Sequence, residues 1–259
     1  MKFSIDHDLH IHSTRSMCCK DEAQTTDAIF KYALENKLKT ICLTDHFWDD
    51  AVPGANKFYK PQNYEHVSRV LPLPENENVR FLFGCETDIS ENLTLGISDE
   101  KIELFDFIII PTTHLHMMYS DYKISNPTKR ADAWVRRFNN VLERDLPFGK
   151  IGIAHPTCRL IARDDEEEFI STLKLIPERE MENIFSRAKE LGVGIELNMS
   201  LDEAKNSAVL HPYEIAKSCG CKFYLGSDAH SVNSLNGAKL RFEAMINALS
   251  LEENDKFVI

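Results

Sequence analysis

The chain lacks any apolar run of membrane-spanning length, and its opening MKFSIDHDLH lacks the long apolar core of a signal peptide. A helix needs about 20 apolar residues to cross a bilayer, and a secretory leader needs an apolar core of about 7–15 residues. We therefore expect a cytoplasmic protein with no membrane contact. With 259 residues, 43% of them hydrophobic, the chain is long enough to bury a sizeable core.

Positive charge is also scarce. Lys and Arg number 30 against 41 Asp and Glu, which gives a formal net charge of −11. This balance argues against extended binding of nucleic acids or anionic membranes, because both carry negative charge themselves. An anionic substrate would need bound metal ions or a few well-placed cationic side chains to reverse the local potential.

No CxxC pair is present, which excludes a zinc ribbon, and the seven cysteines are scattered. Most of them lie in apolar surroundings, which fits buried thiols in a reducing cytoplasm better than a disulfide framework. Gly/Ser linkers, low-complexity segments and internal repeats are absent from the sequence as well. We therefore expect one domain that covers residues 1–259.

Short apolar runs alternate with amphipathic segments along the chain. Seven runs are typical of buried strands, at residues 8–12, 40–46, 79–89, 105–116, 150–156, 193–200 and 223–230. Helical patterns cover residues 25–37, 61–71, 128–144, 177–192 and 211–220, the last two with Pro near the start and Gly at the end. Such alternation favours a parallel α/β domain. We also expect a long loop over residues 47–61 and an extra turn or hairpin within residues 89–101.

Residues that can bind metal gather at the ends of six of these seven strands. In DLHIHS, Asp8, His10 and His12 share one face because side chains alternate along a strand. The complete set of candidates at strand ends is His10, His12, His46, Glu86, His114, His116, His155, Asp228 and His230. The sixth strand offers only Glu196 and Asn198, which we interpret as supporting polar groups. In an α/β barrel the carboxyl ends of the strands converge on one face, so these side chains are expected to meet there.

Six motifs resemble, in order, those of the PHP (polymerase and histidinol phosphatase) superfamily. They are DLHIHS, LTDH, GCETD, TTHLH, IAHPT and GSDAHS, and the resemblance runs from about residue 6 to residue 232. The resemblance implies a distorted (β/α)7 TIM-like barrel, in agreement with the seven strands expected from the pattern. It also implies two or three divalent metal ions that activate water for phosphoester hydrolysis, with no protein nucleophile.

The same resemblance implies roles for individual residues. The implied ligands of a first metal are His10, His12, Glu86 and Asp228; Glu86 would bridge to a second metal held by His114 and His155; and His46 and His230 would belong to a third. The expected catalytic residues are accordingly Glu86, His155 and Asp228. Imidazole and carboxylate ligands suit zinc, manganese or iron better than magnesium alone. Asp8 is expected to orient a ligating histidine, with a plain strand-end hydrogen bond as the alternative.

One segment departs from the family pattern. Where many phosphatase members supply a histidine or an aspartate to the third metal, the sequence after His12 reads STRSMCCKDE. Cys18 is a candidate thiolate ligand, with Cys19 or Asp21 as substitutes; the alternative is that both cysteines are ordinary thiols and the third site is weak. His116 is a similar alternative to His114, which directly ends its apolar run and is preferred.

Candidates for substrate binding rest on charge alone. Arginine suits phosphate because of its bidentate geometry, and the cations that follow the first and fifth strands are Arg15, Lys20, Arg159 and Arg163. Each has a solvated surface charge as its alternative. The remaining histidines are expected to be structural; they are His7, His66 and His211. The acidic run at residues 164–168 is expected to be an exposed helix start.

The leading interpretation is a metal-dependent phosphoesterase that hydrolyses a small phosphorylated substrate, with histidinol phosphate as the best-known single candidate. Phosphotyrosine and nucleotide phosphates are alternatives within this class. A PHP-type nuclease that acts on single-stranded DNA ends is a second interpretation, which the acidic charge disfavours. A third is a non-catalytic, metal-stabilised domain that binds a partner, which the complete core ligand set disfavours.

Overall fold

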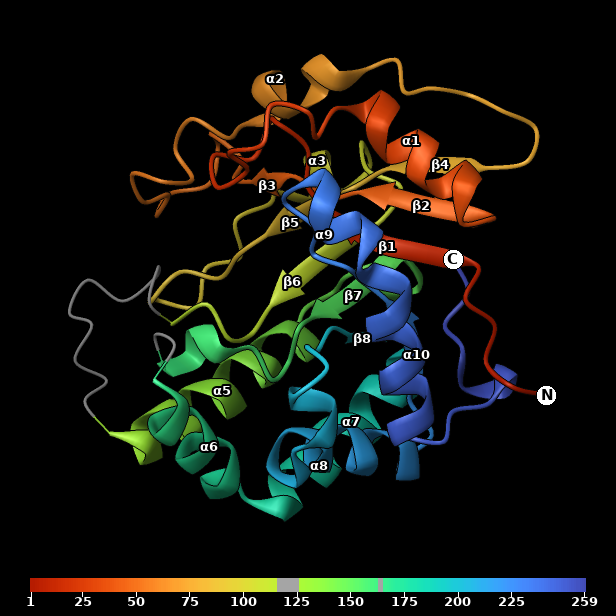
Figure 1. Ribbon diagram of the computed structural model, residues 1–259. Coiled ribbons are helices and arrows are strands. Elements are labelled where there is room, and N and C mark those ends of the chain that lie inside the picture. The colour runs from red at the N-terminus through yellow and green to blue at the C-terminus, as the bar shows by residue number, and fades with distance from the viewer. Residues whose placement is uncertain (116–125, 163–164) are drawn as a thin grey trace.

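The computed structural model describes residues 1–115, 126–162 and 165–259 (Figure 1). These residues form nine short strands whose pairings are all parallel. The strands are β1 (His7–Ile11), β2 (Thr40–Leu43), β3 (His46–Phe47), β4 (Arg80–Phe83), β5 (Cys85–Thr87), β6 (Ile108–Pro111), β7 (Ile151–Ala154), β8 (Gly194–Leu197) and β9 (Lys222–Leu225). The helices are α1 (Thr26–Glu35), α2 (Tyr64–Val67), α3 (Asp99–Ile102), α5 (Pro127–Leu142), α6 (Glu166–Leu175), α7 (Glu178–Leu191), α8 (Ser207–Ser218), α9 (Val232–Asn236) and α10 (Ala238–Ala248).

The nine strands correspond to the seven predicted ones, because two predicted strands are interrupted. Residues 44–45 separate β2 from β3, and Gly84 separates β4 from β5. The ladder continues across the second interruption, where the Gly84 N–H donates to the Leu43 carbonyl over 2.8 Å. A Cβ at Gly84 would lie 2.4 Å from the carbonyl oxygen of Phe107, so the close approach of the neighbouring chain requires glycine here.

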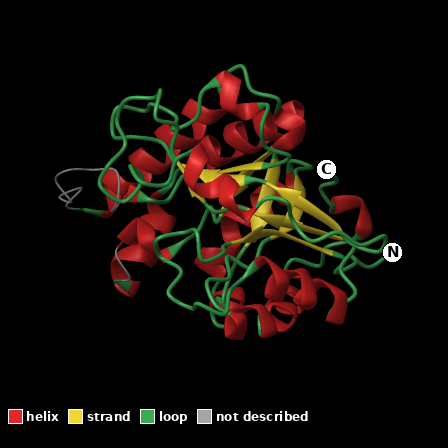
Figure 2. Cartoon of the chain, turned by 90° about the horizontal axis from the view of Figure 1, so that it is seen from above, coloured by secondary structure: helices red, strands yellow, loops and turns green. Residues whose placement is uncertain are grey.

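The strands follow one another in barrel order. One sheet has the order β1-β2-β4 and the other β3-β5-β6-β7-β8-β9. The segment after β9 returns to β1, where the Asp228 N–H donates to the His10 carbonyl over 2.8 Å and the His12 N–H donates to the Ala229 carbonyl over 3.1 Å. These bonds close a ring of seven parallel segments, and helices surround it (Figure 2). The predicted (β/α)7 TIM-like barrel is therefore confirmed.

Buried apolar strands and covering helices make the core. All four residues of β6 are buried, as expected for a parallel strand that is covered on both faces. Helices α5, α6, α7 and α8 lie along one side of the strands, and α1 and α2 lie on the opposite side (Figure 1). Between α5 and α7, the rings of Phe138 and Phe185 meet edge to face with their centroids 5.5 Å apart. Such packing holds the helices and, through them, the strand ends in place.

Several helix limits follow the sequence signals. Pro177 precedes α7, and Gly192 ends it with φ 78°, as predicted. The acidic run begins α6, where Glu166 and Glu167 are exposed and Glu168 is half-buried; residue 164 lies outside the described part. The predicted start of α8 at residue 211 is wrong. The Asn206 side chain accepts a hydrogen bond from the Ala208 N–H and starts the helix earlier, so Pro212 lies inside it.

Two connecting segments also match their predictions. Residues 89–101 contain a turn closed by an antiparallel bridge between Ile89 and Leu95. The helix predicted over residues 61–71 is shorter in the structure. It consists of α2 at Tyr64–Val67, followed by a 3-10 turn at Ser68–Val70. The region between β3 and α2 is a long loop.

The first and last segments lie side by side at the amino end of the barrel (Figure 1). Lys2 and Glu252 form an antiparallel bridge, and the Glu253 N–H donates to the Met1 carbonyl over 2.9 Å. Among the described residues, no helix has the length and apolarity required to cross a membrane.

Candidate metal centre and active site

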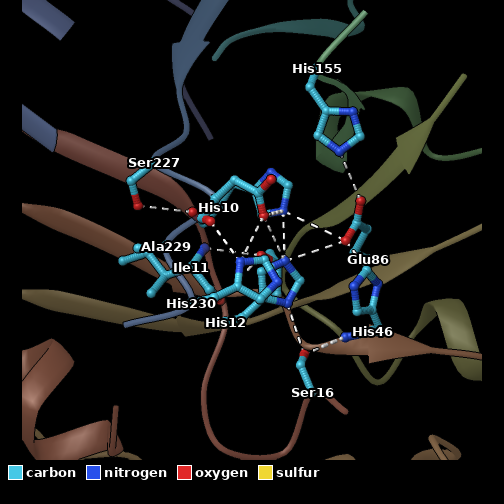
Figure 3. A network of polar contacts seen from close by, with 12 residues as sticks. His10, Ile11, His12, Ser16, His46, Glu86, His155, Ser227, Ala229 and His230 are labelled. Carbon is cyan, nitrogen blue, oxygen red and sulfur yellow. Dashed lines mark hydrogen bonds and ion pairs between the residues drawn. The ribbon is translucent and has the colours of Figure 1, made fainter. Parts of the chain in front are cut away.

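The predicted metal-binding side chains meet at the carboxyl ends of the strands, around a cavity of about 410 Å³. Its lining residues are Cys18, His46, Phe58, Glu86, His114, His155, Leu160, Asp228 and His230. His10 and His12 lie against this group, within the network shown in Figure 3. A larger hollow of about 730 Å³ around Pro72 shares no described lining residue with this cavity.

Glu196 fixes the ring of His10. Its Oε1 lies 2.6 Å from His10 Nδ1, and both side chains are buried. A carboxylate oxygen only accepts, so His10 Nδ1 carries the hydrogen and Nε2 faces the cluster. The second oxygen of Glu196 accepts from the His155 backbone N–H over 2.5 Å. The predicted supporting role of Glu196 therefore has a clear geometry: one carboxylate orients two strand ends.

Ser16 fixes the ring of His12 in the same manner. The Ser16 hydroxyl donates to Asp45 Oδ1 over 2.7 Å and accepts from the His46 backbone N–H over 3.1 Å. Its remaining lone pair accepts from His12 Nδ1 at 2.8 Å, which directs His12 Nε2 into the cluster. Ser16 and Asp45 were not singled out from the sequence, although Asp45 stands inside the LTDH motif.

The two Nε2 atoms of His10 and His12 lie only 2.9 Å apart. Asp228 Oδ1 lies 3.3 Å from the first and 3.1 Å from the second. Burial alone would lower the pKa of His12, but hydrogen bonds with Asp228 and Glu86 outweigh it and raise the pKa to about 9. This pocket therefore attracts positive charge between its nitrogens and carboxylates.

Both carboxylate oxygens of Glu86 face imidazole rings of the cluster. Oε1 faces His155 Nε2 at 3.1 Å and His114 Nε2 at 3.9 Å. Oε2 faces His46 Nδ1 at 2.9 Å and His12 Nε2 at 3.4 Å. Burial alone would raise the pKa of Glu86, but the surrounding histidines hold it well below its usual range. Each carboxylate oxygen thus contacts a different set of imidazoles.

His114 is oriented by a buried network that the sequence did not reveal. Asp88 Oδ2 lies 3.1 Å from His114 Nδ1 and accepts from the Tyr59 hydroxyl over 3.1 Å. Asp88 Oδ1 accepts from Arg137, a fully buried residue of α5, over 2.6 Å. Arg137 stands in an ordinary amphipathic pattern, so only the fold shows that it reaches inward.

His230 and Cys18 close the cluster on the solvent side. His230 Nδ1 lies 2.8 Å from the Asp228 carbonyl, and Nε2 lies 3.0 Å from Cys18 Sγ. Burial, together with the Glu86 and Asp228 carboxylates, raises the pKa of the Cys18 thiol. His155 (φ 27°) and Asp228 (φ 51°) both adopt left-handed backbone conformations. Strain of this kind at non-glycine residues is typical of functional sites.

Asp8 is placed differently from the main expectation. Its Oδ1 accepts from the Ser227 N–H over 2.9 Å, and its Oδ2 accepts from the Tyr32 hydroxyl over 3.1 Å. Its nearest contact with His10 is to the backbone N–H, at 3.4 Å, so the orienting carboxylate of that ring is Glu196. The alternative, a strand-end hydrogen bond, matches this geometry.

The expected structural histidines lie outside the cluster. His7 Nε2 accepts from the Leu225 N–H over 2.9 Å, and His66 Nε2 contacts the Arg15 carbonyl at 2.8 Å. His211 lies on α8, 3.9 Å from Glu214.

The predicted substrate cations do not line the cavity within the described residues. Arg159 pairs with Glu203 at 2.9 Å and with Glu166 at 3.5 Å. Arg15 precedes the Ser16 turn, and Lys20 Nζ donates to the Met17 carbonyl over 2.5 Å. Arg163 and His116 lie outside the described residues.

The donor set fits divalent metal ions. Three groups of side chains each bring one ligand atom per residue within 4.8 Å of the others: His10, Glu86 and His155; His10, His12 and Asp228; and His12, His46 and His230. Imidazole nitrogens with few carboxylates suit zinc, manganese or iron. His46 Nδ1 supports this fit, because it is buried without a properly directed hydrogen bond.

Comparisons with known proteins agree with this geometry. The PHP domain family model matches residues 8–200, a range that ends before Asp228 and His230. The DNA polymerase/3'-5' exonuclease PolX of Bacillus subtilis (strain 168) is 25% identical over 266 positions. That alignment covers 98% of this chain, which spans only 41% of the length of PolX.

Two solved structures share the fold. Histidinol phosphate phosphatase (HISK) from Lactococcus lactis subsp. lactis Il1403, in complex with zinc, L-histidinol and phosphate, superposes with a TM-score of 0.61 at 15% identity, over 98% of this chain and 99% of that one. The hisK protein of Listeria monocytogenes gives a TM-score of 0.58 at 13% identity, over 88% and 96% of the two chains. The chain belongs to the PHP domain family.

Proposed function

We propose that the protein hydrolyses a small phosphomonoester with the help of two or three divalent metal ions. The proposed ligands are His10, His12, His46, Glu86, His114, His155, Asp228 and His230. The observation that carries the proposal is the division of Glu86, whose Oε1 faces His155 while Oε2 faces His46 and His12. A carboxylate placed in this way is suited to bridge two cations.

Bound divalent ions would supply Lewis-acid chemistry, which lowers the pKa of water and neutralises charge that develops on a phosphoryl group. The protein's own residues prepare the site for it. Glu196 and Ser16 hold the rings of His10 and His12 so that their Nε2 atoms face inward. Asp88 holds His114 in the same way. Because these partners are buried, the rings are positioned before any substrate arrives.

The size and charge of the cavity support a small anionic substrate. A volume of about 410 Å³ lies in the range of metabolite pockets. The described lining includes no lysine or arginine, so metal ions are the source of positive charge that this part of the chain offers to a phosphate. Histidinol phosphate is a substrate to test, because the HISK structure holds L-histidinol and phosphate.

A screen of phosphorylated metabolites tests this function. Metal-free protein would be loaded separately with zinc, manganese and iron and assayed first with a generic aryl phosphate. We expect phosphate release only from the loaded protein, and a preference for one small metabolite over the aryl compound. Loaded protein that binds metal but releases no phosphate from any substrate would contradict the proposal.

A nuclease is the second candidate, because the PolX relative is a 3'-5' exonuclease. The same loaded protein should be tested on single-stranded DNA labelled at its 5' end. We expect little shortening, since the net charge of −11 opposes extended contact with a phosphate backbone. Rapid shortening from the 3' end would favour the nuclease.

A further inference from the structure

We propose that Cys18 is a metal ligand and that, with His46 and His230, it forms a thiolate–imidazole site selective for zinc over manganese. The inference rests on the metal-dependent function proposed above, and it assigns the cysteine that the catalytic scheme leaves unused. It concerns the solvent side of the cluster, where Cys18 lies next to His230 and lines the same cavity as His46.

The backbone holds Cys18 at this position. The Cys19 N–H donates to the Ser16 carbonyl over 2.9 Å, which closes a tight turn around Cys18. The Met17 N–H donates to Gln62 Oε1 over 2.9 Å, and the Cys19 thiol donates to the His230 carbonyl over 3.2 Å. The turn is therefore fixed on both sides of Cys18. The Cys18 thiol faces Nε2 of His230.

The hydrogen bonds of His230 leave its Nε2 available. A carbonyl oxygen only accepts, so the contact of 2.8 Å between His230 Nδ1 and the Asp228 carbonyl places the ring hydrogen on Nδ1. Nε2 then presents a lone pair, and Cys18 Sγ lies 3.0 Å from it. Two ligands of one tetrahedral zinc, with bonds of about 2.3 and 2.0 Å, lie roughly 3.5 Å apart. A small outward movement of the thiol is enough to reach this separation.

His46 supplies a third donor. One ring nitrogen of His46 lies within 4.8 Å of ligand atoms of His230 and His12. His46 is buried, and its Nδ1 has no properly directed hydrogen bond despite lying 2.9 Å from Glu86 Oε2. A buried imidazole nitrogen without such a bond is costly unless a cation or a water completes it.

The chemistry of sulfur predicts the selectivity. Thiolates favour zinc, whereas manganese prefers carboxylate, carbonyl and water oxygens. A site made of one thiolate and two imidazoles should therefore keep zinc when manganese competes. The sites around Glu86 contain nitrogen and oxygen donors and should accept either ion.

Cobalt(II) spectroscopy with zinc counting tests the assignment on the full-length protein. Cobalt bound by a thiolate has a sulfur-to-metal charge-transfer band in the near ultraviolet, which imidazole and carboxylate ligands do not produce. We expect this band in the wild type and not in Cys18→Ser. After identical zinc loading, Cys18→Ser should hold one ion fewer per chain. Cys219→Ser is the matched control, since Cys219 Sγ contacts Ser186 of α7 at 3.6 Å, away from the cavity.

A second variant, Cys18→Asp, separates ligation from simple loss of packing. Compared with Cys18→Ser, its carboxylate should restore the lost ion. Compared with the wild type, the variant should lack the cobalt band, and its preference for zinc over manganese should shift at least tenfold toward manganese. A wild type without the band, or a band that persists in Cys18→Ser, would overturn the assignment of Cys18. Neither result touches the proposed function, which fails only if the loaded wild type releases no phosphate.

Discussion

Glu86 lies between two sets of imidazoles, with His155 and His114 facing one carboxylate oxygen and His46, His12 and His10 facing the other. A neutral amide in its place would bridge two cations poorly and would face five histidines without compensating their charge. We therefore expect such a substitution to weaken metal binding as well as catalysis.

We expect Glu86→Gln to lower phosphatase activity by more than the roughly 10–100-fold that loss of an outer-shell partner costs. Metal content after identical loading should fall in parallel. His66→Gln is the control, because His66 Nε2 contacts the Arg15 carbonyl at 2.8 Å and takes no part in the histidine cluster around Glu86. Equal losses from both substitutions would show that the division between ligand and structural histidines is wrong.

A second prediction at this scale concerns His7. Burial lowers the pKa of His7 although Asp6 opposes this effect, and Nε2 accepts from the Leu225 N–H. The unfolded chain binds a proton at this position below about pH 6.5, whereas the folded chain does so only at lower pH. The free energy of unfolding should therefore fall as the pH drops below that value.

His7→Gln removes this titration. We expect the variant to lose less stability than the wild type between pH 7.5 and pH 5.5, even where it is less stable at the higher pH. Urea unfolding at both pH values gives the comparison. Identical changes in the two proteins would place the acid sensitivity elsewhere.

At the scale of elements, the sheet edge near the site depends on a glycine. Gly226 follows β9, and a Cβ there would lie 1.7 Å from Glu196 Oε1 and 2.7 Å from His10 Cβ. These atoms are backbone-adjacent or locked by hydrogen bonds, so they have little freedom to move. The absence of a side chain at Gly226 therefore leaves room for the Glu196 carboxylate that orients His10.

Gly226→Ala should disturb both folding and the site. Overpacking of this kind costs about 1–3 kcal/mol, and displacement of Glu196 would release His10. We expect a lower melting temperature together with weaker metal binding, measured by titration of the metal-free variant. Gly149→Ala is the matched control, because a Cβ there has no atom within 4 Å.

The order of elements was predictable from periodicity, but their interruptions were not. Continuous apolar runs indicated seven strands, and the structure has seven parallel segments. The break at Gly84 depends on the close approach of the Phe107 carbonyl oxygen, which a single run of residues does not encode. The early start of α8 depended on a cap at Asn206, whose signal competed with the more conspicuous Pro212.

The residues of the site likewise divide into those that the sequence predicted and those that it did not. Histidines and acids at strand ends were visible because each ends a local pattern. The groups that hold them were less visible. Arg137 and Tyr59 meet Asp88 only after distant segments fold together. Asp8 was expected to orient a ligating histidine, but Glu196 is the carboxylate that contacts the ring of His10.

For the whole molecule, the proposed metal ligands come from segments that run from β1 to the region after β9. Ions that bind the folded chain alone stabilise it by about 2.7 kcal/mol when present at 100 times their dissociation constant. A protein of this size gains about 2–4 °C in melting temperature per kcal/mol. Chelation should therefore lower the melting temperature by roughly 5–10 °C.

Thermal scans before and after dialysis against a chelator measure this effect, and zinc added back in excess of the chelator should restore the original transition. An unchanged transition after proven removal of metal would mean that the cluster is rigid without ions. In that case the hydrogen bonds of Glu196, Ser16 and Asp88 would be sufficient to hold the strand ends.

The pairing of Lys2 with Glu252 has a practical consequence for engineering. Both ends of the chain lie at the amino side of the barrel, whereas the ligands lie at the carboxyl ends of the strands. A peptide linker could join the ends, and the chain could be reopened in the connection between α5 and β7, where Glu143, Asp145 and Gly149 are exposed, to give a circular permutant. A surface anchor or fluorophore attached near Lys2 would likewise leave the mouth of the cavity open to substrate.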